Sequence, residues 1–199
     1  RLGDPAHGPG HYAKRPPQPA KALGAGETTL LKMVTAYSIF DNGGKKVETT
    51  LIDRIQDRYG HTIYKSDKRD CSLCKQETYT AGSTEPDLAD VREQVMSPYT
   101  AYQITSMMEG VVQRGTGKKL LIVGKPVAGK TGTSSDEKDA WFVGYTPDLA
   151  VGVYVGYDTP KPMGAKRTGG ELAAPTCADF MPFARADQPG NASPRPGAT

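Results

Sequence analysis

The chain has 199 residues, 37% of them hydrophobic, which is enough for one sizeable core with loop-rich margins. Its 25 basic and 22 acidic residues are interspersed and leave a formal net charge of only +3, which argues against a nucleic-acid-binding protein. No run of about 18 apolar residues occurs, so the sequence predicts no membrane-spanning helix in this stretch.

The first predicted element follows a long irregular segment. Residues 1–26 hold five prolines and five glycines without hydrophobic periodicity, and we expect a Pro/Gly-rich leading segment there. A helix is predicted over residues 28–40 and ends at residues 42–44 (NGG). Its predicted apolar face consists of Leu30, Val34, Tyr37 and Phe40.

A polar excursion from the core is predicted at about residues 45–95. Within it, the segments 46–56 and 61–65 alternate in the manner of two strands of a small β-hairpin. The remainder is polar and contains turn-forming residues, so it carries no candidate core positions.

A second helix is predicted after the excursion. Ser97 can cap this helix and Pro98 suits its first turn, whereas Gly115 and Gly117 end it. The predicted apolar stripe consists of Ala101, Ile104, Met107, Met108, Val111 and Val112.

Beyond the second helix the hydrophobic period changes from that of a helix to that of a strand. The predicted strands are residues 120–123, 127–133, 141–145 and 150–157. Residues 146–149 (TPDL) are predicted to form a tight turn, because proline stands where a type I turn favours it. The sequence therefore predicts an α+β fold with an antiparallel sheet near its end, followed by a disordered tail at 184–199.

Residues 129–133 (GKTGT) support two incompatible interpretations. Residues 124–131 match the P-loop pattern G-x-x-x-x-G-K-[ST] and follow an apolar segment, as in a nucleotide hydrolase. A P-loop needs a helix after its lysine, because the helix directs its amide groups and dipole at the phosphates. Residues 132–139 have no apolar stripe and are acidic, and Pro126 removes an amide from the loop, so we disfavour this interpretation.

The other interpretation is the K-T-G strand of serine acyltransferases that act on D-alanyl peptides or β-lactams. An edge strand can bind an extended peptide as an additional strand, and Gly132 lets the peptide backbone approach closely. The Lys130 ammonium and the hydroxyls of Thr131 and Thr133 suit a terminal carboxylate. The motif by itself is weak evidence, because three common residues also occur together on ordinary strands.

The surrounding segments resemble the class A penicillin-binding proteins, with the motifs in the order of that family. The resemblance covers about residues 20–65 and 95–160. Taken together, the motifs are specific for this family, because class A β-lactamases share K-T-G but not the WFVGY run that follows it here. The similar segments are Ala22–Leu31 (ALGAGETTLL), Ala36–Tyr37, Phe40–Gly44 (FDNGG), Tyr102–Gly117 (YQITSMMEGVVQRGTG), Ala128–Thr133 (AGKTGT) and Asp139–Leu149 (DAWFVGYTPDL).

This resemblance implies the α+β penicillin-binding/β-lactamase-like fold, with residues 27–183 as the C-terminal part of a transpeptidase domain. The family consists of bifunctional, membrane-anchored peptidoglycan synthases on the periplasmic side of the bacterial inner membrane, with a glycosyltransferase and a transpeptidase. Implied partners are peptidoglycan stem peptides ending in D-Ala-D-Ala, β-lactams and the upstream part of the same protein. No cofactor, metal or nucleic acid is implied, and the membrane is reached only through the upstream part.

The resemblance also implies residue roles. In this family the serine of an S-x-x-K motif attacks the penultimate D-alanine carbonyl, its lysine activates the serine, and an S-x-N motif relays protons. By matching K-T-G, the residues Lys130, Thr131 and Thr133 hold the substrate carboxylate around Gly132, and the Thr133 amide forms part of the oxyanion hole. Lys130 and Thr133 are the candidate catalytic residues.

The first two motifs are expected upstream of residue 1, so this chain by itself is expected to be inactive. The S-x-x-K match at Ser72–Lys75 is rejected because it lies in the polar excursion, after helices that the family places downstream of its nucleophile. No S-x-N occurs. Asp136, Glu137 and Asp139 flank the motif and are expected in a solvated loop and not in catalysis.

The three cysteines leave more than one chemistry open. The oxidising compartment that the family implies favours a local disulfide between Cys71 and Cys74. Zinc binding by this pair together with one of the three histidines is the alternative, although no further ligand has sequence support. Cys177 falls where the family has a C-terminal helix and is expected to be a small buried apolar group.

Three classes of function are therefore weighed. The leading hypothesis is part of an enzyme that transfers an acyl group through a serine ester. The second is a non-catalytic module that binds peptidoglycan peptides or a partner protein. The third, a P-loop nucleotide hydrolase built on Gly124–Thr131, requires a helix after Thr131.

Overall fold

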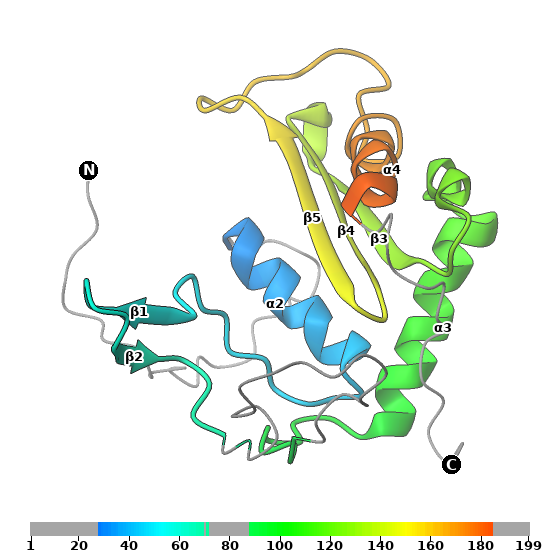
Figure 1. Cartoon of the computed structure of the whole chain (residues 1–199). Helices are drawn as coiled ribbons and strands as arrows, with labels where there is room; N and C mark the ends of the chain where they lie inside the picture. The colour runs from blue at the N-terminus through cyan, green and yellow to red at the C-terminus, as the bar shows by residue number, and fades with distance from the viewer. Residues whose placement is uncertain (1–27, 70, 72–87, 185–199) are drawn as a thin grey trace, which may run out of the picture.

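A three-stranded antiparallel sheet in the order β3–β4–β5 forms the centre of the molecule, with helices on both faces (Figure 1). The computed structural model describes residues 28–69, 71 and 88–184. The α+β class predicted from the sequence is confirmed. In chain order the elements are α2 (Leu30–Asp41), β1 (Arg54–Gln56), β2 (Thr62–Lys65), α3 (Pro98–Arg114), the 3-10 helix η2 (Lys118–Val123), β3 (Ala128–Thr133), the 3-10 helix η3 (Ser135–Glu137), β4 (Asp139–Thr146), β5 (Leu149–Gly156) and α4 (Ala173–Ala184).

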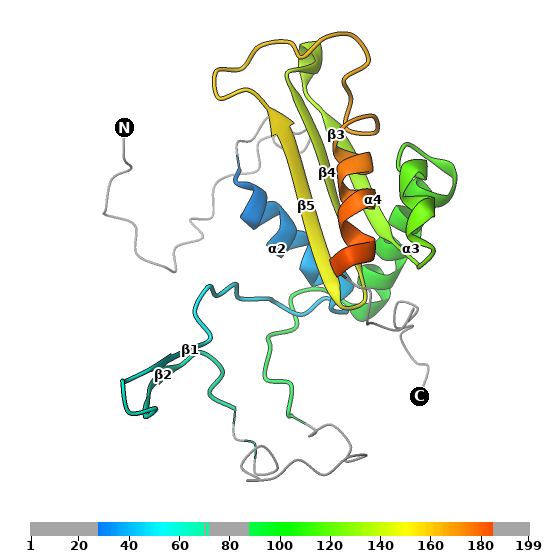
Figure 2. The same ribbon diagram turned by 45° about the horizontal axis from the view of Figure 1, so that its top comes forward.

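The two faces of the sheet bury different side chains, because successive residues of a strand point to opposite faces. In β4, Phe142 packs with Val151 of β5 against Cys177 and Met181 of α4. Tyr145 points the other way and packs against both other long helices, through Tyr37, Phe40, Ile104 and Met108. Figure 2 shows α4 on one face of the sheet, with α2 and α3 on the other.

Glycines let large groups reach the sheet. A Cβ on Gly129 would stand 2.5 Å from the Phe142 ring, and one on Gly144 would stand 2.6 Å from it, so this pair of facing glycines leaves the space that the ring fills. On the opposite face, a Cβ on Gly152 would stand 2.5 Å from Val34 of α2. The helix and the ring can therefore pack closely only because these positions carry no side chain.

The two long helices follow the sequence prediction with some corrections. Thr29 caps α2 by accepting a hydrogen bond from the Lys32 amide at 3.3 Å. Ser97 stands at the start of α3, but its side chain makes no capping hydrogen bond. Met107 was expected in the α3 stripe and is 65% exposed, because the buried face runs one position away from it. That buried face consists of Ala101, Thr105, Met108, Gly110 and Val112.

The predicted strand at residues 120–123 is wrong, because this segment forms the 3-10 helix η2. Leu120 is fully buried and Val123 packs against the core, whereas Ile122 is 77% exposed, so the segment does not bury alternate residues as a strand would. Gly124, in the left-handed region at φ 68°, turns the chain into β3. A four-residue apolar run is too short for its period to distinguish the two structures.

Two short paired segments, which we call the stems, close the base of the excursion: Lys45–Lys46 on one side and Glu93–Gln94 on the other. Lys45 and Gln94 form an antiparallel bridge, and the Lys46 amide donates to the Glu93 carbonyl at 2.8 Å. Farther out, β1 and β2 form the predicted hairpin, but β1 covers only Arg54–Gln56 of the expected strand at 46–56. All residues of both strands are exposed.

Three predictions concern segments that lie outside the described residues: the leading segment 1–26, the Ser72–Lys75 match and most of the tail at 184–199. Cys71 is disulfide-bonded, which removes the thiolate that a zinc site would need. Cys177 is a free, fully buried thiol in α4, as the sequence predicted. Within the described ranges no helix has the length and apolar character needed to cross a membrane.

A matched pair of substitutions in α4 tests this packing. Met181 is fully buried and Phe183 is 85% exposed on the same helix. We expect Met181→Ala to lower the free energy of unfolding by about 2–5 kcal/mol, because it leaves a cavity between α4 and the sheet. Phe183→Ala is expected to change it by less than about 0.5 kcal/mol. Urea denaturation of both variants checks this, and equal losses would contradict the packing of α4.

The second prediction concerns the Cys177 thiol. Burial raises its pKa from the ordinary value of 9.0 to about 12. We expect Cys177 to resist a thiolate-specific reagent in the folded protein at pH 8 and to react once urea exposes it. Because the folded-state pKa is the higher one, the associated stabilisation is complete below pH 9 and is lost as the pH rises toward 12. Labelling of the folded protein as fast as the unfolded protein would contradict this burial.

Candidate functional site

The candidate site lies on β3, which is one of the two edge strands of the sheet within the described residues. Ser134 pairs with Asp139 by a backbone hydrogen bond of 3.1 Å, and the β3–β4 register continues from this pair. In an antiparallel ladder, pairs that exchange hydrogen bonds alternate with pairs that do not. Thr131 and Thr133 fall in the non-bonded positions, so their backbone N–H and C=O groups face away from β4.

The side chains alternate in the same way. Lys130 lies opposite Val143 and is exposed, with its ammonium donating to the Thr131 carbonyl at 2.7 Å. Thr131 and Thr133 lie opposite Phe142 and Ala140, on the face that α4 covers. Gly132 pairs with Trp141 of β4, and a Cβ added to Gly132 would stand 3.3 Å from the Cβ of Trp141. Within the described residues, Lys130–Thr133 thus lie together on a strand edge that pairs with no further strand.

Two further segments meet the threonines. The connection after α3 places the Thr116 hydroxyl 2.6 Å from the Thr131 hydroxyl. The segment before α4 places Gly169 at the end of β3, where its amide donates to the Thr133 hydroxyl at 3.0 Å. A Cβ on Gly169 would stand 2.4 Å from the Gly132 carbonyl oxygen, so only glycine fits there. Neither contact is predictable from local sequence patterns, because Thr116 and Gly169 are distant from β3 along the chain.

Glu137 has a role that the sequence analysis missed. Its carboxylate accepts hydrogen bonds from the amides of Lys166 and Arg167, at 3.1 and 3.3 Å. Its carbonyl accepts from the Met163 amide at 3.1 Å. The β3–β4 connection, expected as a solvated loop, is therefore hydrogen-bonded through Glu137 to the segment before α4. We call these three hydrogen bonds of Glu137 the Glu137 brace. Asp136 and Asp139 make local contacts, the first with Lys138 and the second with Tyr154.

The phosphate-binding interpretation of residues 124–131 fails in this fold. Thr131 lies in the middle of β3, which continues as a strand through Thr133. The next element is the three-residue η3, followed at once by β4. A helix whose amides could surround a phosphate is therefore absent at the position where a P-loop requires it.

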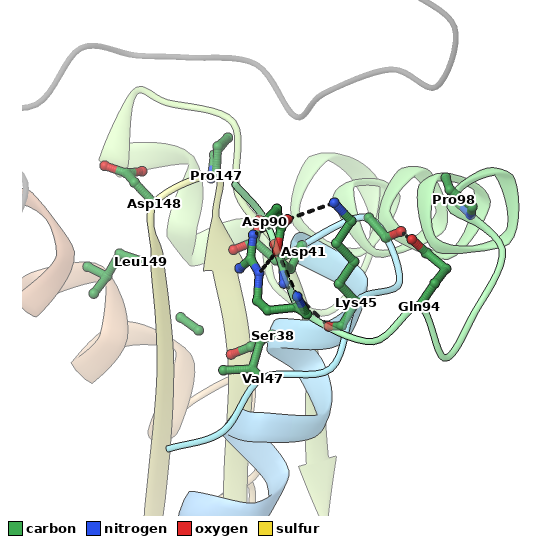
Figure 3. Close-up of a pocket in the computed structure, with 14 residues that line it drawn as sticks. Ser38, Asp41, Lys45, Val47, Asp90, Gln94, Pro98, Pro147, Asp148 and Leu149 are labelled. Carbon is green, nitrogen blue, oxygen red and sulfur yellow. Dashed lines mark hydrogen bonds and ion pairs between the residues drawn. The ribbon is translucent and has the colours of Figure 1, made fainter. Parts of the chain in front are cut away.

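A separate pocket lies at the base of the excursion (Figure 3). It has a volume of about 590 Å³ and is bordered by the end of α2, the two excursion stems and the β4–β5 turn. Asp90 joins both stems there, with oxygens 2.7 Å from the Lys45 ammonium and 2.7 Å from Arg92 Nε. Hydrogen bonds from Arg92 and Lys45 hold the pKa of Asp90 well below its ordinary range. The charges of Asp90, Lys45 and Arg92 are thus paired with one another, and these ion pairs lie where the excursion meets the core.

The β3 edge combines groups of complementary chemistry. Its outward backbone groups can pair with an extended peptide. Its ammonium and two hydroxyls can bind a carboxylate, and an outward amide such as that of Thr133 can stabilise an oxyanion. In the part of the chain that the structure describes, no group of three or more His, Cys, Asp or Glu side chains is arranged to hold a metal ion.

Comparison with known proteins gives a consistent family. The model of the penicillin binding protein transpeptidase domain matches residues 15–182. Penicillin-binding protein 1A of Rickettsia prowazekii (strain Madrid E) is 45% identical over 172 residues, which are 84% of this chain and 21% of that protein. The corresponding protein of Neisseria gonorrhoeae is 42% identical over 164 residues, covering 82% of this chain and 18% of its own length. The chain thus spans about one fifth of the length of these relatives.

Solved structures agree in fold. Penicillin-binding protein 1A from Haemophilus influenzae superposes with a TM-score of 0.73 at 29% identity, over 89% of this chain and 29% of that one. PonA1 from Mycobacterium tuberculosis, in complex with penicillin V, has a TM-score of 0.74 at 23% identity. That match covers 92% of this chain and 45% of PonA1 and shows a shared fold.

Proposed function

Because the chain belongs to the transpeptidase-domain family of penicillin-binding proteins, we propose that it is the C-terminal part of a serine D,D-transpeptidase. The intact enzyme cross-links peptidoglycan stem peptides on the periplasmic side of the inner membrane, in a polypeptide that also carries a glycosyltransferase. Its substrates end in D-Ala-D-Ala, and β-lactams acylate it in their place.

The observation that carries this proposal is the orientation of the β3 edge. The outward amide of Thr133 is suited to stabilise the oxyanion that forms when a serine attacks the D-alanine carbonyl. The Thr131 and Thr133 hydroxyls and the Lys130 ammonium bind the terminal carboxylate. Gly132 allows the peptide backbone to approach, and Lys130 also tunes the proton transfer from the serine.

The nucleophile belongs, in this proposal, to a part of the longer polypeptide that these 199 residues do not include. The chain has no S-x-N, and of its two S-x-x-K matches Ser72–Lys75 lies in the polar excursion and Ser135–Lys138 lies at the short η3 between β3 and β4. Residues 129–133 would therefore supply the substrate-binding half of a composite site. The 199 residues by themselves are not expected to form an acyl-enzyme.

Labelling with a fluorescent penicillin tests the proposal. We expect the intact protein to form a covalent adduct and the 199-residue chain to form none. In the intact protein, Lys130→Ala should slow acylation by about 100-fold or more, because it removes the cation beside the carboxylate and the proton relay. Lys32→Ala, on the exposed surface of α2, is the matched control and should acylate at the wild-type rate.

The site of the adduct separates the alternatives. Intact-mass and peptide analysis should find it outside residues 1–199. An adduct on Ser72 or another serine of this chain would refute the composite site. An intact protein that binds peptidoglycan peptides but never acylates would instead favour a non-catalytic binding module.

A further inference from the structure

At the C-terminal end of β3, β4 pairs with the backbone and a loop segment contacts the Thr133 hydroxyl. The amide of Gly169 donates to the Thr133 hydroxyl oxygen at 3.0 Å. A hydroxyl oxygen that accepts a backbone N–H keeps its own proton free to be donated elsewhere. The Gly169 contact therefore leaves the Thr133 hydroxyl proton available for another acceptor.

The segment that carries Gly169 is itself fastened by Glu137. The Glu137 carboxylate accepts one amide on each oxygen, from Lys166 and Arg167, and its carbonyl accepts from Met163. These bonds join residues about 30 positions apart in the sequence. They hold the segment just before Gly169 beside the end of β3. Carboxylate hydrogen bonds of this kind are stronger than those between neutral groups.

The backbone at this contact is unusual. Asp136, Glu137 and Lys166 have φ values of 60°, 53° and 64°, and they are the non-glycine residues with positive φ in the described part of the chain. Such conformations are uncommon for residues with a Cβ and persist where the surrounding contacts impose them. All three lie at the two ends of the Glu137 brace, next to the candidate site.

We propose that Glu137 is a positioning residue: it holds the segment 163–169 against the end of β3 so that the Gly169 amide orients the Thr133 hydroxyl toward the substrate carboxylate. The proposal rests on the function proposed above. Glu137 itself does not touch the substrate. Its effect is transmitted through Gly169 and Thr133, so it should appear in substrate binding and acylation only while the Thr133 hydroxyl is present.

A double-mutant cycle in the intact protein tests this transmission, with the second-order rate of acylation by fluorescent penicillin as the readout. We expect Glu137→Ala to lower this rate about 3- to 10-fold and Thr133→Ala to lower it about 10- to 100-fold. The double variant should be no slower than Thr133→Ala, because both changes remove the same oriented donor. Glu137→Gln keeps one acceptor oxygen and should recover part of the rate.

Glu171→Ala is the matched control. Glu171 borders the same surface hollow as Glu137, but its carboxylate meets only the Lys119 side chain in the described contacts, at 3.4 Å. This control should acylate like the wild type. The proposal is overturned if Glu137→Ala acylates as fast as the Glu171→Ala control. It is also overturned if the rate reductions of Glu137→Ala and Thr133→Ala multiply in the double variant. Unchanged acylation in Thr133→Ala would overturn the carboxylate-binding role of Thr133 together with it.

Amide hydrogen exchange separates this inference from the proposed function, because it requires no acylation. Glu137→Ala should accelerate exchange at Lys166, Arg167 and Gly169 while leaving the amides of β4 and β5 protected. Unchanged exchange at Gly169 would refute the brace, even in a protein that acylates normally. If Glu137→Ala accelerates exchange in this pattern but the intact wild-type protein never acylates, the enzyme assignment is refuted and, with it, the role of Glu137 in binding substrate.

Discussion

Everything at the candidate site depends on the hydrogen-bonding register between β3 and β4. The pairing of Ser134 with Asp139 sets which residues of the edge strand turn their backbone groups inward. A shift of one residue would turn the groups of Thr131 and Thr133 into the sheet and expose those of Lys130 and Gly132. The K-T-G residues would then keep their identities but present the wrong groups at the edge.

Packing on both faces maintains this register. Phe142 and Tyr145 point to opposite faces of β4, one toward α4 and the other toward α2 and α3. The Tyr145 hydroxyl lies 2.7 Å from the buried Thr105 hydroxyl, and burial raises the pKa of this tyrosine. Moving either ring to the other face would leave a large side chain without its cavity and a buried hydroxyl without its partner. Core packing thus holds the edge strand in the orientation that the site requires.

The sheet and the loops contribute differently to the site. The sheet positions the backbone of β3, whereas the segments around Thr116 and Gly169 meet its hydroxyls. The loop contacts consist of hydrogen bonds and left-handed backbone, with little apolar burial, so they can adjust more readily than the core. A composite site, completed by other parts of a longer polypeptide, would combine a rigid strand with loops that can accommodate substrate.

The sequence by itself determined the elements with long periodic patterns and the segments that resemble the family. The helices at 30–41 and 98–114, the last three strands and the turn between β4 and β5 follow from local periodicity and turn chemistry. Tertiary structure decided the remainder. Residues 118–123 form a 3-10 helix in which Leu120 and Val123, three residues apart, contact the core. Glu137 acquired amide partners about 30 residues away, and no local pattern encodes a contact between two loops that only the folded sheet brings together.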